Sequence, residues 1–231
     1  VETITVTEKD VDRLAPGEFL NDTLIDFYLR YMSDNILKSA QRKRCHIFSS
    51  FFFTKYRDSD PEDRYESVRK WTKDVDIFKK KFLLVPINES LHWSLAIICY
   101  PKLIFNPPRK NKEKRNKPCI LYLDSLMRKR GAVGHCKLLR AYLAQEAKVK
   151  QNIEMKVASG NLPLHFMKVP QQKNSSDCGV FLLQYAENFC KEPLAYDATK
   201  GECTEWFDSK GVRNKRKAIR DLLDEMRGEN L

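Results

Sequence analysis

The sequence has little glycine and no long apolar run. Only 8 of its 231 residues are glycine, about half the usual share. None of them forms a Gly-x-Gly-x-x-Gly or Walker-type loop, so the common phosphate-binding motifs are absent. The longest apolar segments, 82–87 and 95–100, are about six residues long, whereas a membrane-spanning helix needs about 20. We therefore expect no membrane helix and no nucleotide-binding loop of the usual kind.

Paired-cysteine motifs are also missing. The 7 cysteines are an odd number and include no Cys-x-x-Cys pair, and the adjacent Cys and His residues at 45–46 and 135–136 lack zinc-ligand spacing. This usage is typical of a reducing compartment rather than of a disulfide scaffold. We expect no metal and no other cofactor.

Apolar residues and positive charge are plentiful. A hydrophobic share of 42% is ample for a buried core in a chain of 231 residues. The net charge of +11 is uneven, because the segment 102–118 holds seven basic residues and one acidic residue. A second basic cluster spans 210–220. Such clusters are typical of a solvated mobile loop, a localisation sequence, or a contact with nucleic acid or an acidic partner.

Apolar periodicity predicts one α+β domain over residues 1–231, with a basic loop insertion at about 102–118. We expect a dense, buried aromatic segment at 45–53, and no regular structure at 102–118 because of Pro107-Pro108. The predicted strands are 3–7, 82–87, 93–100 and 119–123, and the predicted helices run from Asn21 or Asp22 to about Lys38 and over 135–148, 178–190 and 218–226.

Three reactive side chains stand at the ends of these elements. His92 begins a predicted strand, Asp124 ends another, and Cys178 begins a helix. A cysteine attacks a carbonyl as thiolate, and a helix N-terminus and a nearby imidazolium both favour that form. A carboxylate orients the imidazole. The three residues therefore predict nucleophilic catalysis by Cys178, with His92 as base and acid and Asp124 as its partner.

Acyl transfer also needs donors for the developing oxyanion. Gln172 lies six residues before the cysteine in a polar loop, so its side-chain amide is a candidate donor beside the backbone N–H of Cys178. Gly179 allows close approach of the chain after the nucleophile. Each residue alone also has an ordinary structural explanation: packing for the cysteine, a satisfied side chain for the histidine, a turn for the aspartate.

A family resemblance covers nearly the whole chain. The motifs that carry it, in order, are Gly-Glu-Phe-Leu-Asn-Asp at 17–22, the aromatic segment 47–53, the segment 68–78, Val-Pro-Ile at 85–87, His-Trp at 92–93, Leu-Asp-Ser at 123–125, Val-Pro-Gln-Gln at 169–172 and Asp-Cys-Gly at 177–179. The chain resembles the SUMO-specific (sentrin-specific, ubiquitin-like-protein-processing) cysteine proteases. The His, Asp, Cys order matches that family, whereas papain has the order Cys, His, Asn.

The resemblance implies a papain-like cysteine protease fold, with a central mixed or antiparallel sheet flanked by helices. It implies a narrow tunnel that holds the SUMO diglycine tail under two aromatic rings, which match Trp93 and Phe19. The best-known members have tryptophan in place of Phe19, but a flat ring still covers two glycines. Asp22 matches an acid that pairs with a basic residue of SUMO, and it is also a candidate helix cap.

The resemblance also implies the substrate. Phe19, the run 174–179, the insertion before Cys119 and the segment 205–207 are similar to the chain-editing branch of the family. We expect hydrolysis of the isopeptide bond after the SUMO diglycine, with SUMO conjugates and poly-SUMO chains as partners. The family and the basic clusters imply a nuclear, monomeric enzyme without cofactor or membrane contact.

Two alternatives remain at this point. The same chemistry could act on another ubiquitin-like modifier, and the surface around Asp22 and 69–71 would make the difference. A protein of a different class would be a non-catalytic basic module, which binds nucleic acid or an acidic partner through 102–118 and 210–220. Such a module would not need Cys178.

Overall fold

The computed structural model describes residues 3–107, 116–192 and 203–228. Residues 108–115 of the expected basic insertion at 102–118 therefore lie outside the described residues. The described part builds one five-stranded mixed sheet in the order β1-β2-β3-β4-β5. The three inner strands are antiparallel and both edge strands are parallel to their neighbours. The strands are β1 (Cys45–Ile47), β2 (Phe82–Glu89), β3 (His92–Cys99), β4 (Cys119–Leu123) and β5 (Leu164–Phe166).

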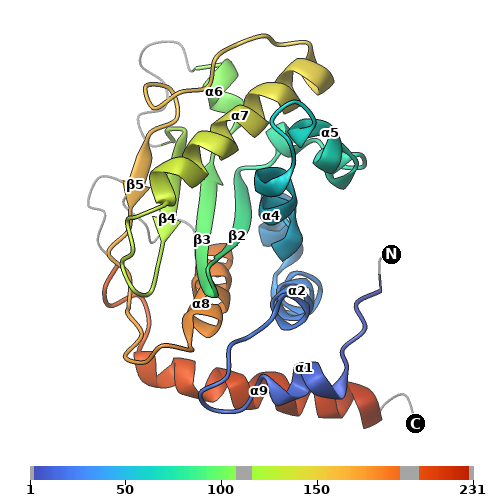
Figure 1. The fold of residues 1–231 in the computed structure, drawn as a ribbon, viewed down its shortest axis with the longest axis vertical. Coiled ribbons are helices and arrows are strands. Elements are labelled where there is room, and N and C mark those ends of the chain that lie inside the picture. Colours follow the sequence, from blue (N-terminus) through green and yellow to red (C-terminus); the bar gives the residue numbers. More distant parts are fainter. Residues whose placement is uncertain (1–2, 108–115, 193–202, 229–231) are drawn as a thin grey trace.

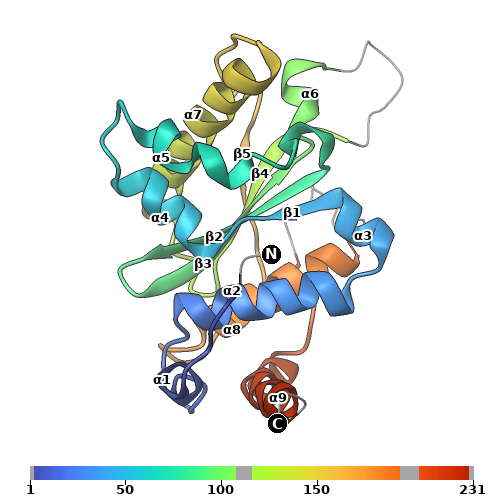
Figure 2. The ribbon, with the colours of Figure 1, turned by 90° about the vertical axis from the view of Figure 1, so that its right-hand side faces the viewer.

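Helices cover both faces of this sheet (Figure 2). Helices α4, α5 and α7 lie on one face, α2 and α8 lie on the other, and α9 runs beyond them beside α1 (Figure 1). The helices are α1 (Glu8–Asp12), α2 (Asp22–Tyr31), α3 (Ser39–Arg44), α4 (Ser50–Asp58), α5 (Arg64–Val68), α6 (Lys102–Phe105), α7 (Ala132–Gln151), α8 (Cys178–Lys191) and α9 (Ser209–Gly228), with a π-helical turn at Met32–Ile36 and 3-10 turns at Arg69–Thr72 and Ile77–Lys79.

The inner strands read as continuous apolar runs because both their faces are buried. On β3, Leu95 and Ile97 face the core that contains α2 and α8. Ala96 and Ile98 face the second core, with α4 and α7. The predicted strands 82–87, 93–100 and 119–123 and the predicted helices 135–148 and 178–190 are confirmed, with shifted ends. The α+β fold class is confirmed as well.

The prediction of a strand at 3–7 is wrong. The Thr7 backbone N–H and hydroxyl both donate to the Asp10 carboxylate at 2.7 Å, and this capping box starts α1. The aromatic segment 45–53 is not one buried element either. Ser49 caps α4, and the helical turn leaves Phe51 53% exposed. Residues 102–105 form the short helix α6 before Pro107, so the prediction of no regular structure over 102–118 is wrong there.

The N-terminus of α2 is capped by Asn21, whose side chain accepts a hydrogen bond from the Leu24 N–H at 3.1 Å. Asp22 is therefore the first helical residue, and its expected second role as the cap is wrong. The helix changes to a π-helical turn at Met32, so the predicted helix to Lys38 is interrupted.

The last helix begins much earlier than the predicted 218–226. Its first half buries two charged side chains beside the apolar Val212. Lys215 forms a 2.6 Å ion pair with Glu187 of α8, and Arg216 is buried against Asp177. The basic cluster 210–220 therefore points partly into the molecule and is not simply a solvated basic face. Within the described residues, no helix has both the length and the apolarity that crossing a membrane requires.

Candidate active site

His92 and Asp124 meet because their strands are antiparallel neighbours. A two-residue turn, Ser90-Leu91, joins β2 to β3, and both residues have the positive φ values (52° and 61°) of a tight primed hairpin turn. His92 is thus the first residue of β3, next to the end of β4. Its Nε2 lies 2.8 Å from Oδ1 of Asp124, and both side chains are buried.

The Asp124 carboxylate is held by the turn that follows it. Its Oδ1 accepts a hydrogen bond from the Leu126 N–H at 2.8 Å, and its Oδ2 accepts one from the Arg128 N–H at 3.2 Å. These backbone donors fix the carboxylate in the orientation that faces His92. The Asp124 carboxylate engages Nε2 of His92, so Nδ1 is the ring nitrogen left for another partner.

Cys178 is the first residue of the 14-residue helix α8 and is 1% exposed. It lies close enough to His92 to influence the pKa of the imidazole. Burial lowers the pKa of His92, but the hydrogen bonds to Asp124 and Cys178 and the charges of both groups raise it to about 9. At neutral pH the imidazole is therefore protonated, which is the state that stabilises a thiolate at Cys178.

The loop before Cys178 is organised by Asn174. Its side-chain oxygen accepts hydrogen bonds from the Ser176 and Asp177 N–H groups at 3.2 and 3.1 Å, and its amide donates to Asp177 Oδ2 at 2.8 Å. Tyr185 donates to the Pro170 carbonyl from within α8. This polar scaffold holds the chain in a turn immediately ahead of the nucleophile.

Gln172 is fixed between two loops. Its Oε1 accepts a hydrogen bond from Ser125 Oγ at 2.5 Å, and its Nε2 donates to the Asn174 carbonyl at 2.7 Å. One of the two amide hydrogens is thereby used, and the other is still available as a donor. The structure thus brings Gln172 next to the Cys178 loop, and its oxyanion role stays a prediction. The sequence reasoning assigned no role to Ser125, which aims this amide.

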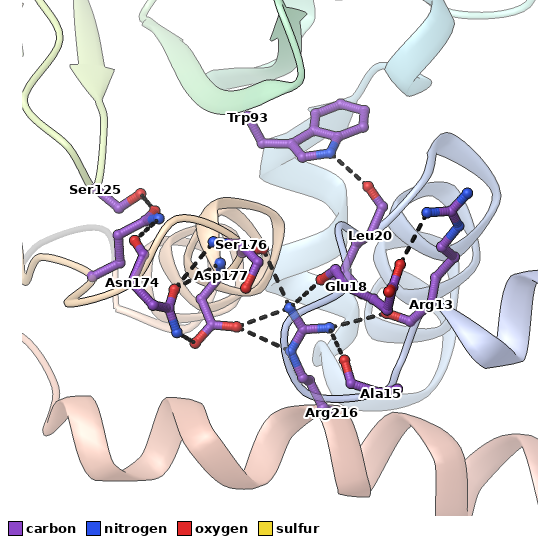
Figure 3. A network of polar contacts seen from close by, with 11 residues as sticks. Arg13, Ala15, Glu18, Leu20, Trp93, Ser125, Asn174, Ser176, Asp177 and Arg216 are labelled. Atoms are coloured by element: carbon purple, nitrogen blue, oxygen red, sulfur yellow. Dashed lines mark hydrogen bonds and ion pairs between the residues drawn. The ribbon is translucent and has the colours of Figure 1, made fainter.

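Trp93 and the segment before α2 close around the first turn of α8. The Trp93 indole N–H donates to the Leu20 carbonyl at 2.8 Å, and the ring is buried (Figure 3). A Cβ on Gly179 would lie 3.0 Å from Leu20 Cβ and 3.2 Å from Trp93 Cδ1, so any larger residue there would require these neighbours to move by a few tenths of an ångström. Phe19 is half-buried against the same core. The two predicted tunnel aromatics therefore come from segments that meet over the nucleophile helix.

Asp22 lies in the first turn of α2, half-buried, and within the described residues its carboxylate has neither an ion pair nor a hydrogen bond. Its charge acts on Asp26, whose pKa is raised mainly by burial. Because Asn21 supplies the cap, the Asp22 carboxylate is left for another partner. Its predicted role in binding SUMO stays a prediction.

Together, the mixed sheet, the helix that begins at Cys178 and the hydrogen-bonded His92 and Asp124 define the papain-like class of cysteine peptidases. Within the described residues, no three His, Cys, Asp or Glu side chains cluster in a way that could hold a metal ion. The chain belongs to the Ulp1 protease family, whose C-terminal catalytic domain it matches over residues 18–229.

Individual relatives agree with this assignment. The chain is 36% identical to the probable ubiquitin-like-specific protease 2B of Arabidopsis thaliana, over 97% of this chain and 26% of that protein. It is 34% identical to human sentrin-specific protease 7, over 94% of this chain and 26% of that protein. The chain thus spans about a quarter of these relatives' length. A de-sumoylating protease of known crystal structure shares the fold with a TM-score of 0.74 at 27% identity, covering 98% of this chain and 91% of that one.

Proposed function

We propose that this chain is a SUMO-specific cysteine protease domain that hydrolyses the isopeptide bond between the SUMO C-terminal glycine and a substrate lysine. The observation that carries the proposal is the 2.8 Å contact between His92 Nε2 and Asp124 Oδ1 beside Cys178 at the start of α8. The names of the relatives, a de-sumoylating protease and a sentrin-specific protease, support SUMO as the modifier.

The reaction proceeds through the proposed roles of these residues. The Cys178 thiolate attacks the carbonyl carbon of the last SUMO glycine, and the oxyanion accepts hydrogen bonds from the Cys178 backbone N–H and the Gln172 amide. His92 gives its proton to the leaving lysine amine, and a thioester remains on Cys178. His92 then takes a proton from water, which attacks the thioester and releases the SUMO carboxylate. Asp124 stays ionised and keeps the imidazole oriented.

Specificity for a diglycine tail follows from the crowding over α8. Leu20 and Trp93 already approach Gly179 so closely that an added Cβ would lie only 3.0 and 3.2 Å from them, which is tighter than ordinary van der Waals contact. A tail that passes beside these groups, under Phe19 and Trp93, must itself lack side chains. Asp22 supplies a negative charge at the start of α2 for a basic residue of SUMO.

Chain trimming and location complete the proposal. Similarity to a sentrin-specific protease 7 and a ubiquitin-like-specific protease 2B supports the trimming of poly-SUMO chains. The basic segment 102–118 and the family support a nuclear location for a monomer in which residues 1–231 act as one catalytic domain. Part of the other basic cluster is buried, so a nucleic-acid-binding module has less surface than the sequence indicates.

The test is hydrolysis of fluorogenic C-terminal derivatives of SUMO, ubiquitin and a third ubiquitin-like modifier. We expect cleavage of SUMO alone, loss of all activity in Cys178→Ala, and wild-type activity in the matched control Cys203→Ala, which removes a half-buried thiol outside the site. Preference for another modifier would be consistent with the mechanism but would refute the assignment of SUMO as the substrate. If the folded wild-type protein cleaves none of the three derivatives, the proposal that this chain is an active protease would be refuted.

A further inference from the structure

Arg216 of α9 lies buried between two segments that form the proposed active site (Figure 3). Its Nε and one terminal nitrogen donate to Oδ1 of Asp177 at 3.0 and 2.8 Å. The same terminal nitrogen donates to the carbonyls of Ser176 at 3.2 Å and Glu18 at 2.7 Å. The other terminal nitrogen donates to the carbonyls of Arg13 at 3.0 Å and Ala15 at 3.4 Å. All three guanidinium nitrogens are therefore engaged.

The first of these segments is the loop that ends at the nucleophile. Arg216 binds Ser176 and Asp177, the two residues directly before Cys178. The other carboxylate oxygen of Asp177, Oδ2, accepts a hydrogen bond from the Asn174 side-chain amide. The Asn174 backbone carbonyl accepts one from the Gln172 side-chain amide. A continuous set of hydrogen bonds thus runs from Arg216 through Asp177 and Asn174 to the predicted oxyanion donor.

The second segment is the strap 13–20, which carries Phe19. Three of its carbonyls, at Arg13, Ala15 and Glu18, are bound to Arg216, and a fourth, at Leu20, is bound to the Trp93 indole. Gly17 reverses the strap between these points with φ of 89°. The strap is therefore fixed at one end by α9 and at the other end by the tryptophan that follows His92.

We propose that Arg216 is a positioning residue that holds the strap and the Cys178 loop at a fixed separation. The proposed binding path for the diglycine tail, beside Phe19, then stays aligned with the Cys178 thiol. This inference rests on the proposed function. A displacement of about 1 Å at a reacting group lowers rates by about 100-fold. A guanidinium is suited to the task because its planar array of five N–H donors has fixed geometry, and lysine has three donors on one flexible point charge.

Three variants test the proposal. Arg216→Lys keeps the charge and removes the planar array, and Arg216→Gln removes both. Asp177→Asn, nearly isosteric, weakens the same contact from the other side. The matched control is Arg220→Gln, since Arg220 lies one turn further along α9 and, among the described residues, donates only to the Val11 carbonyl at 3.0 Å, outside both segments.

The first measurement needs no substrate. We expect the rate of iodoacetamide alkylation of Cys178, followed from pH 5 to 10, to fall about tenfold in both Arg216 variants with an altered pH profile. We expect Arg220→Gln to match the wild type. The alkylation rate does not depend on the modifier, so it tests the positioning role of Arg216 even if the wild type cleaves no SUMO derivative. Absence of SUMO cleavage would refute the proposed function and leave the role of Arg216 to be decided by alkylation.

The second measurement is hydrolysis of the SUMO derivative. We expect kcat to fall about 10- to 100-fold because Cys178 is displaced, and KM to rise severalfold because the strap is displaced. The double variant Asp177→Asn/Arg216→Lys should lose little more than either single variant, since both break one connection.

A purely structural role gives a different pattern. If Arg216→Lys and Asp177→Asn lower the melting temperature but stay within twofold of the wild type in alkylation rate and in kcat/KM below that temperature, the proposal is wrong. Should Arg216→Gln fail to fold, the other two variants decide the question by the same criteria.

Discussion

At the scale of single residues, the protonation of His92 governs the site. Its pKa of about 9 lies above the ordinary 6.5, despite burial, because Asp124 and Cys178 favour the imidazolium. This raised pKa makes the stability of the fold depend on pH. His92 contributes stability that is fully present below pH 6.5, and this contribution is lost as the pH rises through 9. The same deprotonation removes the cation that stabilises the thiolate.

We predict that Asp124→Asn lowers the pKa of His92 towards 6.5 and lowers kcat by about 100- to 10,000-fold, because the imidazolium loses its anionic partner and its preferred orientation. The pKa is measured by NMR titration of the His92 ring C–H, with His165 as an internal reference outside the site. A His92 pKa that stays near 9 in the variant would show that Asp124 is not the source of the shift.

Gly179 gives a second prediction at this scale. Gly179→Ala places a methyl group against Leu20 and Trp93 at 3.0 and 3.2 Å. We expect a loss of about 1–3 kcal/mol in the free energy of unfolding and a large loss of kcat/KM, because the first turn of α8 must shift. Urea denaturation and the fluorogenic assay measure both.

The matched control for Gly179→Ala is Gly134→Ala in α7, where a Cβ meets no atom within 4 Å. There we expect unchanged activity and a gain of about 0.4–1 kcal/mol, as alanine is the better helix former. Equal effects at the two glycines would contradict the close packing around Gly179.

At the scale of elements, a buried ion pair attaches α9 to α8. Lys215 lies 2.6 Å from Glu187, which also accepts a hydrogen bond from Tyr28 of α2 at 2.7 Å. Burial raises the pKa of Glu187, but Lys215, Lys191 and Tyr28 outweigh burial and lower it to about 2 from 4.5. This carboxylate therefore contributes stability that is present above pH 4.5 and lost as the pH falls through 2.

We predict that Lys215→Met costs about 3–5 kcal/mol of unfolding free energy at pH 7, because it leaves a buried carboxylate without its main partner. The double variant Lys215→Met/Glu187→Gln should recover part of that loss. Urea denaturation at pH 7 and pH 3 measures the effect, and the difference between wild type and Lys215→Met should shrink at pH 3. A single variant as stable as the wild type would show that the pair does not hold α9.

The β2–β3 turn, which directly precedes the proposed catalytic residue His92, gives a further prediction. Ser90 and Leu91 both have left-handed backbone angles, and Leu91 is 73% exposed. Asn-Gly is the preferred sequence of such a turn. We expect Ser90→Asn/Leu91→Gly to raise the unfolding free energy by about 1 kcal/mol. A fall in the melting temperature would mean that Leu91 makes a contact that matters.

The elements also show what sequence can predict. The strands β2 to β4 are visible as apolar runs since both their faces are covered, and α7 and α8 follow from apolar periodicity. The start of α9 could not be predicted from apolar periodicity, because two of its inward side chains there, Lys215 and Arg216, are charged. The alternation over 3–7 indicates a strand, but these residues form neither strand nor helix, and the Thr7–Asp10 capping box starts α1 directly after them.

At the scale of the whole molecule, the site joins parts that are distant in sequence. His92 and Asp124 come from neighbouring inner strands, Cys178 from the helix under them, and the strap 13–20 from the N-terminal part. The end positions of His92, Asp124 and Cys178 could be predicted from the sequence together with the family motifs. The hydrogen bonds of Ser125 to Gln172, and of Arg216 to the Cys178 loop and the strap, could not be predicted, because no local sequence pattern marks a long-range polar contact.

The central claim is that Cys178 accepts the SUMO diglycine tail as its acyl group. The most direct test is a SUMO probe that carries a C-terminal vinyl sulfone, incubated with the protein beside the equivalent ubiquitin probe, followed by peptide mass spectrometry. We predict one covalent SUMO adduct located at Cys178, absent in Cys178→Ala and strongly reduced with ubiquitin. An adduct at another cysteine, or a folded protein that the SUMO probe leaves unmodified, would contradict it.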